Sequence, residues 1–494
     1  MRNTDAKFIK AAGVAAAVLV VVAAVYSASK GRALEAVFIV TVGLAAVSAA
    51  AGWATRRAWL MPIFFWAALS LPLVKHVGRG AGLPAINADH LIVYPVDFII
   101  LLALAWVFVS NLKQERTVRV GLEPYRRALT NILKPDLISW AIIAAGAATA
   151  FSLYNAPEPA PTLFALLDVA RLYAAYVVFR QLAAAGPGVV AGAVLAVAVA
   201  HSALCLIEFS AQSSFGLWEK PGWGAFIFSG ASPQAARFLV ARGGGTFEPN
   251  VTAQYLQMAM PFAAAYFLSA AGARRRTLYL SILLLAAAAL FVTFSRGGWF
   301  GAAVALAVVV AVAWLKRRDL GAPRWAVAAL TAFGVILLLP VTAVVLARGV
   351  QGDQLSAASR LTDWRIALAM IRDHPLLGVG KGNYLELARL YNPWALEYPV
   401  HNVYLFLWAE TGIVGLLALV AMLVGSFRAA VRALGDKAGY GATFGLAAAA
   451  AFAGIAARMF VSMSFVHPFV SLSFIALAGA AARLAAGPPA QNKT

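Results

Sequence analysis

The sequence predicts an all-α protein that crosses a membrane many times. Of its 494 residues, 62% are hydrophobic and only 12% are charged, and the mean hydropathy is +0.80. The apolar residues form runs of about 20 residues, which is the length that a helix needs to cross a hydrocarbon core of about 30 Å. The basic residues gather in clusters between these runs, as they do in the loops of polytopic membrane proteins.

Fourteen apolar runs are candidate spans, and twelve to fourteen helices are expected because the third run is short. The polar segment 348–400 lies between two of the runs and is the large external loop of this prediction. The runs cover residues 9–27, 34–53, 59–74, 91–111, 137–154, 162–183, 188–210, 251–270, 277–294, 297–315, 324–347, 401–427, 441–457 and 461–483.

The dense basic clusters all fall on one side when the spans alternate from a cytoplasmic N-terminus. Segments 274–276 and 316–318 are two such clusters, whereas the opposite connection 155–161 has no Lys or Arg. Because basic residues are enriched in cytoplasmic loops, both termini are expected to be cytoplasmic. The same bias explains the net charge of +20. No nucleic-acid partner is expected, since no contiguous soluble basic domain is present.

Neither a metal nor a cofactor is expected. The single cysteine, Cys205, lies in an apolar run and excludes both an intrachain disulfide and a cysteine-based metal cluster. The six histidines show none of the close spacings that zinc sites use. Segment 378–382 (Gly-Val-Gly-Lys-Gly) lacks the spacing and the trailing Ser or Thr of a P-loop, so we expect a tight turn there.

The segment 348–400 is too polar to lie in lipid, and we interpret it as the lid and wall of an active site on the non-cytoplasmic side. Within it, residues 357–372 carry apolar side chains that suggest a short amphipathic helix, ended before Pro375. The other long external segment, 211–250, contains no alternation that would predict a sheet.

Four arginines on the external side are candidates for binding a phosphate or pyrophosphate, because a guanidinium is always charged and matches phosphate geometry. They are Arg242, Arg296, Arg360 and Arg365. A single external arginine more often contacts lipid headgroups or pairs with an acid. That explanation is weaker for Arg296, because it stands in a very short external turn where the positive-inside bias disfavours a basic residue.

His401 is the candidate for proton transfer. It stands at the mouth of a predicted span, beside Asn402 and at the end of the long polar segment. An imidazole with a pKa near about 6.5 can accept a proton at neutral pH. From position alone, a catalytic base and an interfacial or capping residue are equally good interpretations of this histidine.

Ionisable residues in or near spans suggest a transporter as the contrasting class of function. Asp168 and Arg171 are three residues apart on one predicted helix and are expected to pair. Most of the others lie close to span ends, which favours interfacial or paired roles; they are Asp97, Glu208, Glu410 and Arg458.

Four segments in this order resemble the bacterial O-antigen ligase and polymerase superfamily, over roughly residues 241–415. They are 242–250, which begins with Arg and ends in Pro-Asn, 295–297 (Ser-Arg-Gly), 360–380 with Asp-His-Pro-Leu at 373–376, and 401–415, which begins with His-Asn.

The resemblance implies a glycosyltransferase that uses neither a nucleotide sugar nor a metal. Such enzymes move a glycan from undecaprenyl pyrophosphate to an acceptor sugar hydroxyl, on the periplasmic side of the bacterial inner membrane. The family's essential histidine matches His401, and its essential arginines are similar to Arg296, Arg360 and, less surely, Arg242. Arg365 is the alternative to Arg360. Asn250 and Asn402 are expected to support the site.

Several functions therefore stay open at this point, among them a non-enzymatic assembly scaffold, in which the basic and histidine-bearing external loop would be incidental. The chain is expected to be an O-antigen ligase, with lipid A–core as the acceptor, or an O-antigen or exopolysaccharide polymerase that joins carrier-linked repeat units. Direct attack would invert the anomeric centre in either case. A transporter or flippase of lipid-linked sugars is the alternative of a different class. The expected divisions are N-terminal helices in 1–240, a ligase or polymerase core in 241–428, and C-terminal helices and tail in 429–494.

Overall fold

The computed structural model describes residues 135–487, apart from 183–186, 215–224, 229–237, 317, 348, 393–398 and 436–439, together with scattered positions between 65 and 130. The predicted spans 9–27 and 34–53 lie outside the described residues, and the spans 59–74 and 91–111 lie within them only in part.

The described chain is helical, and ten of its helices correspond to the spans predicted after residue 136. They are α6 (Leu137–Ser152), α7 (Pro159–Leu182), α8 (Pro187–Ala211), α9 (Pro249–Ser269), α10 (Ala273–Val292), α11 (Arg296–Leu315), α12 (Arg324–Ala347), α15 (Val403–Leu434), α16 (Tyr440–Arg458) and α17 (Pro468–Ala485). Within the described residues, eight helices are long and apolar enough to cross a membrane. The predicted class, a polytopic helical membrane protein, is confirmed.

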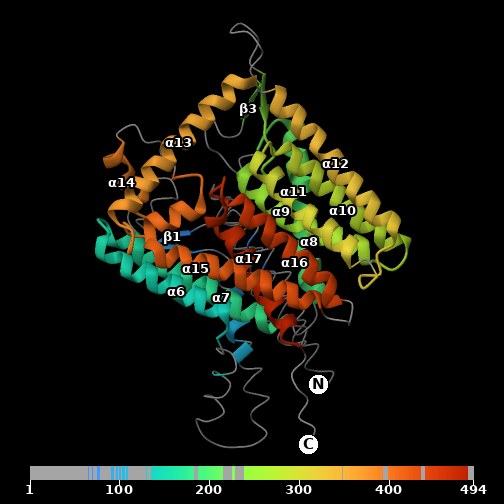
Figure 1. The fold of residues 1–494 in the computed structure, drawn as a ribbon, viewed down its shortest axis with the longest axis horizontal. Coiled ribbons are helices and arrows are strands. Elements are labelled where there is room, and N and C mark those ends of the chain that lie inside the picture. The colour runs from blue at the N-terminus through green and yellow to red at the C-terminus, as the bar shows by residue number, and fades with distance from the viewer. Residues whose placement is uncertain are drawn as a thin grey trace, which may run out of the picture.

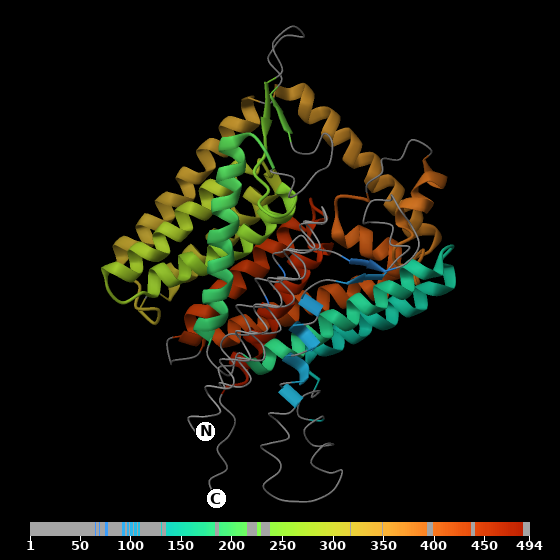
Figure 2. The ribbon, with the colours of Figure 1, turned by 180° about the vertical axis from the view of Figure 1, so that it is seen from behind.

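The helices form two packed groups with α16 and α17 between them (Figures 1 and 2). Helices α6, α7 and α15 lie side by side in one group, and α8 to α12 make up the other. Helix α16 contacts α9 and α11 of the second group and α15 of the first, while α17 contacts α7 and α15. The middle pair therefore joins the two halves of the bundle.

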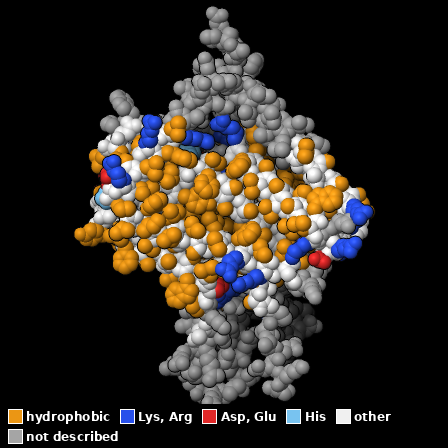
Figure 3. Space-filling view, in the orientation of Figure 1, with side chains coloured by type: hydrophobic (Ala, Val, Ile, Leu, Met, Phe, Trp, Pro, Cys, Tyr) orange, Lys and Arg blue, Asp and Glu red, His pale blue; other side chains and the backbone are white. Residues whose placement is uncertain are grey.

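The surface supports a membrane location. Hydrophobic side chains cover a broad middle band of the face seen in Figure 3, and Lys and Arg side chains gather above and below it. Large apolar side chains on the helices face outward, among them Trp140, Phe151 and Leu417. An apolar band of this kind between polar margins is typical of a surface that contacts lipid chains.

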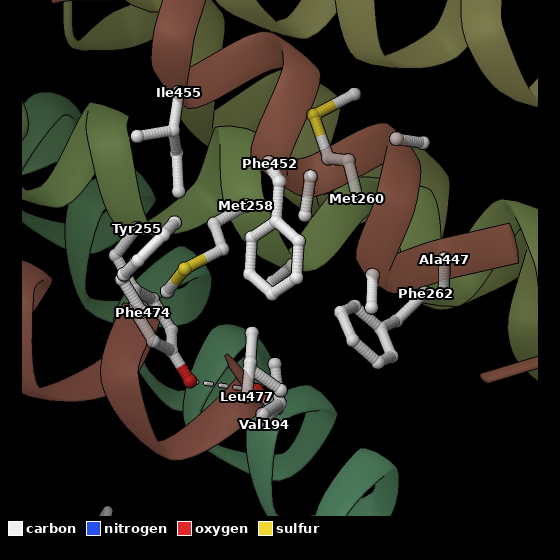
Figure 4. Packing of buried hydrophobic residues seen from close by; sticks show 14 of the residues in the cluster. Val194, Tyr255, Met258, Met260, Phe262, Ala447, Phe452, Ile455, Phe474 and Leu477 are labelled. Atoms are coloured by element: carbon white, nitrogen blue, oxygen red, sulfur yellow. Dashed lines mark hydrogen bonds between the residues drawn. The ribbon is translucent and has the colours of Figure 1, made fainter. Parts of the chain in front are cut away.

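Helix α9 forms the centre of the second group. Every residue from Val251 to Leu268 is buried, and α9 is not among the eight helices that meet the criteria for a span. Its aromatic and methionine side chains pack against α16 and α17 (Figure 4). The Tyr255 hydroxyl donates to the Val194 carbonyl of α8 at 2.9 Å. The low apolar content of α9 is thus tolerated because other helices, not lipid, surround it.

Two antiparallel pairs of short strands accompany the helices. β1 (Lys75–Val77) pairs with β2 (Leu91–Val93), and β3 (Ala225–Phe228) pairs with β4 (Phe238–Ala241). The expectation that segment 211–250 contains no sheet was wrong. Strands of four residues offer too few positions for an alternating pattern to be recognised.

The segment 348–400 is more helical than the sequence suggested. It contains α13 (Gly349–Asp373) and α14 (Tyr384–Tyr391), and α13 runs from the end of α12 toward α14 (Figure 1). The expected helix 357–372 is part of α13, but its predicted apolar face was partly wrong. Ile366 and Ile371 are buried, whereas Leu361 and Leu368 are 58% and 49% exposed.

The turn after α13 docks on the kinked part of α15. Gly378, Gly380 and Gly382 all have positive φ values, of 72°, 95° and 87°, which confirms the predicted tight turn. Lys381 pairs with the buried Glu410, and the Gly382 N–H donates to the same carboxylate at 2.9 Å. This explains why an acidic residue is tolerated inside α15.

Gly412 generates a test of this docking. Its φ is 69°, and a Cβ atom there would lie 1.9 Å from the carbonyl oxygen of Leu376. We expect Gly412→Ala to lower stability by at least about 2 kcal/mol, because left-handed strain and a backbone clash add. Thermal unfolding in detergent measures the loss. Gly192→Ala in α8 is the control, since no atom lies within 4 Å of its Cβ position, and equal melting temperatures for the two variants would contradict the prediction.

Candidate active site

Arg242 follows β4 directly and is joined to the turn between α10 and α11. Its Nε donates to the Thr293 carbonyl at 2.7 Å, and its Nη2 donates to the Asn250 side-chain oxygen at 3.0 Å. The Gly243 N–H donates to the Val292 carbonyl at 3.1 Å. The predicted supporting residue Asn250 therefore holds Arg242 at the start of α9.

The three glycines after Arg242 pack tightly on α8. Glu208 is buried, and one of its carboxylate oxygens accepts from the N–H groups of Gly244 and Gly245, each at 2.7 Å. A Cβ atom at Gly243 would lie 2.5 Å from the Cys205 carbonyl oxygen. Glu208 thus fixes the loop that carries Arg242, and this role accounts for its acidic group at the end of a span.

Arg296 is the first residue of α11 and is half-buried. The preceding Ser295 caps the helix by accepting from the Gly298 N–H at 3.4 Å, and Phe294 has a φ of 48°. A left-handed backbone is uncommon for a bulky residue and is often found at functional sites. Arg296 therefore lies at the positive end of the α11 dipole, where an anion is favoured.

Arg458 at the end of α16 belongs to the same cluster. Its side chain is 1% exposed, and its Nη2 donates to the Asn250 carbonyl at 2.7 Å and to the Ser295 hydroxyl at 3.2 Å. Sequence reasoning interpreted Arg458 as an interfacial or paired residue. Its position at the external end of a predicted span, against the positive-inside bias, was the signal that could have singled it out, as it did Arg296.

His401 and Asn402 stand at the start of α15. The Asn402 side chain caps the helix by accepting from the N–H groups of Tyr404 and Leu405 at 3.0 and 3.1 Å. The Val403 N–H donates to the Met459 carbonyl at 2.9 Å. The start of α15 is therefore bonded to the residue that follows Arg458.

Charged groups of α13 surround His401. Its Nδ1 lies 4.0 Å from an Asp363 oxygen, too far for a hydrogen bond, and this buried nitrogen has no hydrogen-bond partner among the described residues. Burial, with the nearby Arg360 charge, lowers the pKa of His401 below its usual range. Burial also raises the pKa of Asp363, against the opposing effect of Arg360. Its surroundings therefore favour the neutral form of the His401 imidazole, the form that can accept a proton.

The surroundings of Arg360 and Arg365, which the sequence left as alternatives, differ in the structure. Arg360 acts electrostatically on both His401 and Asp363, whereas Arg365 is exposed and does not act on either. Asp363 was missed by sequence reasoning. Its signal was the three-residue spacing from Arg360, which puts both side chains on one face of a helix.

The candidate site thus has two parts that meet at the end of α16. One part contains Arg242, Arg296 and Arg458, and the other contains Arg360 and His401. The bond from Val403 to Met459 joins them. In the part of the chain that the structure describes, no group of three or more His, Cys, Asp or Glu residues could hold a metal ion.

The charge of Arg360 predicts a measurable property of His401. We expect the pKa of His401 to lie below 6.5, its ordinary value, and to rise toward that value in Arg360→Met, because one of the two effects that lower it is removed. The rate of acylation by diethyl pyrocarbonate, measured against pH and corrected with His401→Ala, reports this pKa. Arg365→Met is the control, and an equal shift in both arginine variants would contradict the assignment.

Comparison with known proteins bears on the same segment. No curated protein sequence matches the chain. Residues 281–420 match the family model described as O-antigen ligase. This range contains Arg296, Arg360 and His401, while Arg242 and Arg458 lie outside it. Residues 281–420 are therefore similar to the O-antigen ligase family, which supports the resemblance found in the sequence.

Proposed function

We propose that the chain is a glycosyltransferase that moves a glycan from undecaprenyl pyrophosphate to a sugar hydroxyl of lipid A–core. The observation that carries the proposal is the junction at the end of α16. There hydrogen bonds join the start of α15, which follows His401, to the end of α16, and join Arg458 to the segments that carry Arg242 and Arg296. A base and an anion-binding cluster are the two groups that this transfer needs.

The arginines would bind the donor. Arg296 lies in the first turn of α11, and Arg242 is bonded to Asn250 at the start of α9. Their guanidiniums suit a pyrophosphate. Charge develops on the leaving pyrophosphate as its bond to the sugar C1 breaks. Fixed positive groups stabilise that charge more in the transition state than in the ground state, which is how they would accelerate the reaction.

His401 would activate the acceptor. The acceptor oxygen attacks C1, the C1–O bond to the pyrophosphate breaks, and the hydroxyl proton passes to the imidazole. Asp363 lies 4.0 Å from Nδ1, so a small movement of either side chain would bring it into contact with the imidazolium that forms. A single displacement of this kind inverts the anomeric centre and needs no covalent intermediate.

The predicted topology puts this site on the periplasmic face of a bacterial inner membrane, with both termini in the cytoplasm. The external position of 348–400 and the opposite position of the basic clusters support that proposal. The division at 241–428 also stays a proposal, and the site as described would take Arg458 from the C-terminal segment 429–494.

The transporter alternative loses one of its supports. Asp168 and Arg171 do pair, as predicted, and Arg171 also bonds to Asp97. Arg171 thus pairs with both carboxylates and holds α7 to the segment that carries Asp97. Paired groups of this kind have a structural role that needs no ion pathway to explain it.

Substitution in the purified protein tests the proposed function. We expect His401→Ala to reduce glycan transfer by about 10²- to 10⁴-fold, because general-base catalysis is lost, and Arg296→Ala to abolish detectable transfer. Arg365→Ala is the matched control and should retain activity, since Arg365 is exposed on α13. Each variant is compared at equal amounts of folded protein, with an undecaprenyl-pyrophosphate-linked glycan as the donor.

Two acceptors in separate reactions distinguish the remaining alternatives. Product on lipid A–core that depends on His401 would establish a ligase. A ladder of longer carrier-linked chains, formed without lipid A–core, would establish the polymerase instead. If intact protein with its native glycan gave neither product, the proposed enzymatic function would be wrong.

A further inference from the structure

Arg458 connects two helix starts that carry the proposed donor-binding groups. Its Nη2 donates to the carbonyl of Asn250, the residue whose side chain holds Arg242. The same nitrogen donates to the hydroxyl of Ser295, which caps α11 just before Arg296. One nitrogen atom of α16 therefore fixes the first turns of both α9 and α11.

The rest of the Arg458 guanidinium is buried and makes no hydrogen bond to the described residues. Nε and Nη1 have no hydrogen-bond partner among the described residues, and the charged neighbours that act on the group are Arg242 and Glu248. A buried, incompletely paired charge is costly, and an apolar side chain of similar volume is often as stable or more so. Packing alone thus gives no reason for an arginine here.

Two glycines next to Arg296 leave room for this side chain. A Cβ atom at Gly297 would lie 3.5 Å from the Arg458 Nε, and one at Gly298 would lie 3.1 Å from Nη1. Glycine has no side chain and permits close approach of other groups. The Arg458 guanidinium is among the groups that pack on these glycines, together with Ala253 and Leu290 at Gly298, so the first turn of α11 lies against it.

The same end of α16 also holds the start of α15. Besides the bond from Val403 to Met459, the Tyr404 hydroxyl donates to the Ala456 carbonyl at 2.9 Å. The Arg458 turn is thus fixed on one side by the helix that begins after His401 and on the other by α9 and α11. A change at Arg458 can therefore move Arg242 and Arg296 while these α15 bonds stay in place.

We propose that Arg458 is a positioning residue for the lipid diphosphate: it aligns Arg242 and Arg296 so that they bind the pyrophosphate of the donor together. The inference rests on the proposed function. Arg458 acts through its bonds to Asn250 and Ser295, and its buried charge adds to the positive potential that the diphosphate meets.

Steady-state kinetics with both substrates varied independently provide the test. In Arg458→Met we expect the donor KM to rise or kcat to fall so that kcat/KM for the donor drops by about 10²-fold, the usual cost of a misplacement of about 1 Å. The acceptor KM should stay within about two-fold of the original value. Arg458→Lys keeps the charge and one donor group, and it should recover part of the loss.

Direct binding provides a second readout. Undecaprenyl pyrophosphate without a glycan is titrated into the protein in nanodiscs, with undecaprenyl monophosphate as the comparison. Arg458→Met should bind the diphosphate more weakly and lose most of its preference over the monophosphate. If Arg458→Met does not fold, Arg458→Lys is used in both the kinetic and the binding experiments. It should lower the donor kcat/KM and weaken diphosphate binding, by less than is expected for Arg458→Met.

Arg180→Gln is the matched control. Arg180 is a largely buried arginine that pairs with Asp136 at 3.4 Å, next to the start of α6. This variant breaks the pair with Asp136 and should keep the donor constants and the diphosphate preference. A purely structural role of Arg458 would make the two variants alike, with donor and acceptor constants changed equally or not at all, and would overturn the proposal.

The outcomes also separate this inference from the proposed function. If His401→Ala and Arg296→Ala lose transfer as expected above while Arg458→Met keeps the original donor constants, only the role of Arg458 is wrong. If His401→Ala transfers glycan normally, the proposed function itself fails, whatever the diphosphate binding of Arg458→Met.

Discussion

The pair of hydrogen bonds that Arg458 donates from inside the bundle is the constraint on which the candidate site depends. Hydrophobic burial brings α9, α11 and α16 together, but it is not directional and does not fix the first turns of the helices. The bonds to Asn250 and Ser295 do fix them. The adjacent bond from Val403 to Met459 adds the helix that follows His401. The apolar core thus supplies the association, and a few buried polar contacts supply the geometry.

A second set of polar contacts positions the external helices. Asn155 donates to the Gly378 carbonyl at 2.8 Å, and Thr162 donates to the Lys381 carbonyl at 2.8 Å. These bonds join the turn after α13 to the connection that follows α6 and to the first turn of α7. Together with the Glu410 contacts they hold α13 by its C-terminal end. Arg360 and Asp363 are thereby fixed relative to α15, although they belong to a helix that is more polar than the bundle.

Much of the fold followed from the sequence, because lipid imposes a simple rule on span length and on the position of basic residues. The bounds of α6 to α12 and of α15 to α17 agree with the predicted spans to within a few residues at most ends. The face of α13 was less predictable. Leu361 and Leu368 are apolar yet exposed. The periodicity of an amphipathic helix predicts an apolar face, but it does not identify the element that packs against the helix.

The candidate site was predictable only in part, for a related reason. His401 and Arg296 stand out locally, by their places at helix ends. Arg458 and Asp363 belong to the site because of contacts with residues far away in the sequence. A single sequence does not show such contacts.

The complete burial of α9 has a consequence for how the protein is made. Helix α9 leaves the ribosome long before α16 and α17, which later surround it. Until then its Gln254 and Gln257 amides, which have no partner within the described part of the bundle, would face lipid or the translocation channel. We therefore expect α9 to be retained at the insertion machinery until the last helices arrive. Chains truncated before α16 should be degraded, and a stable truncated chain in the membrane would contradict this order of assembly.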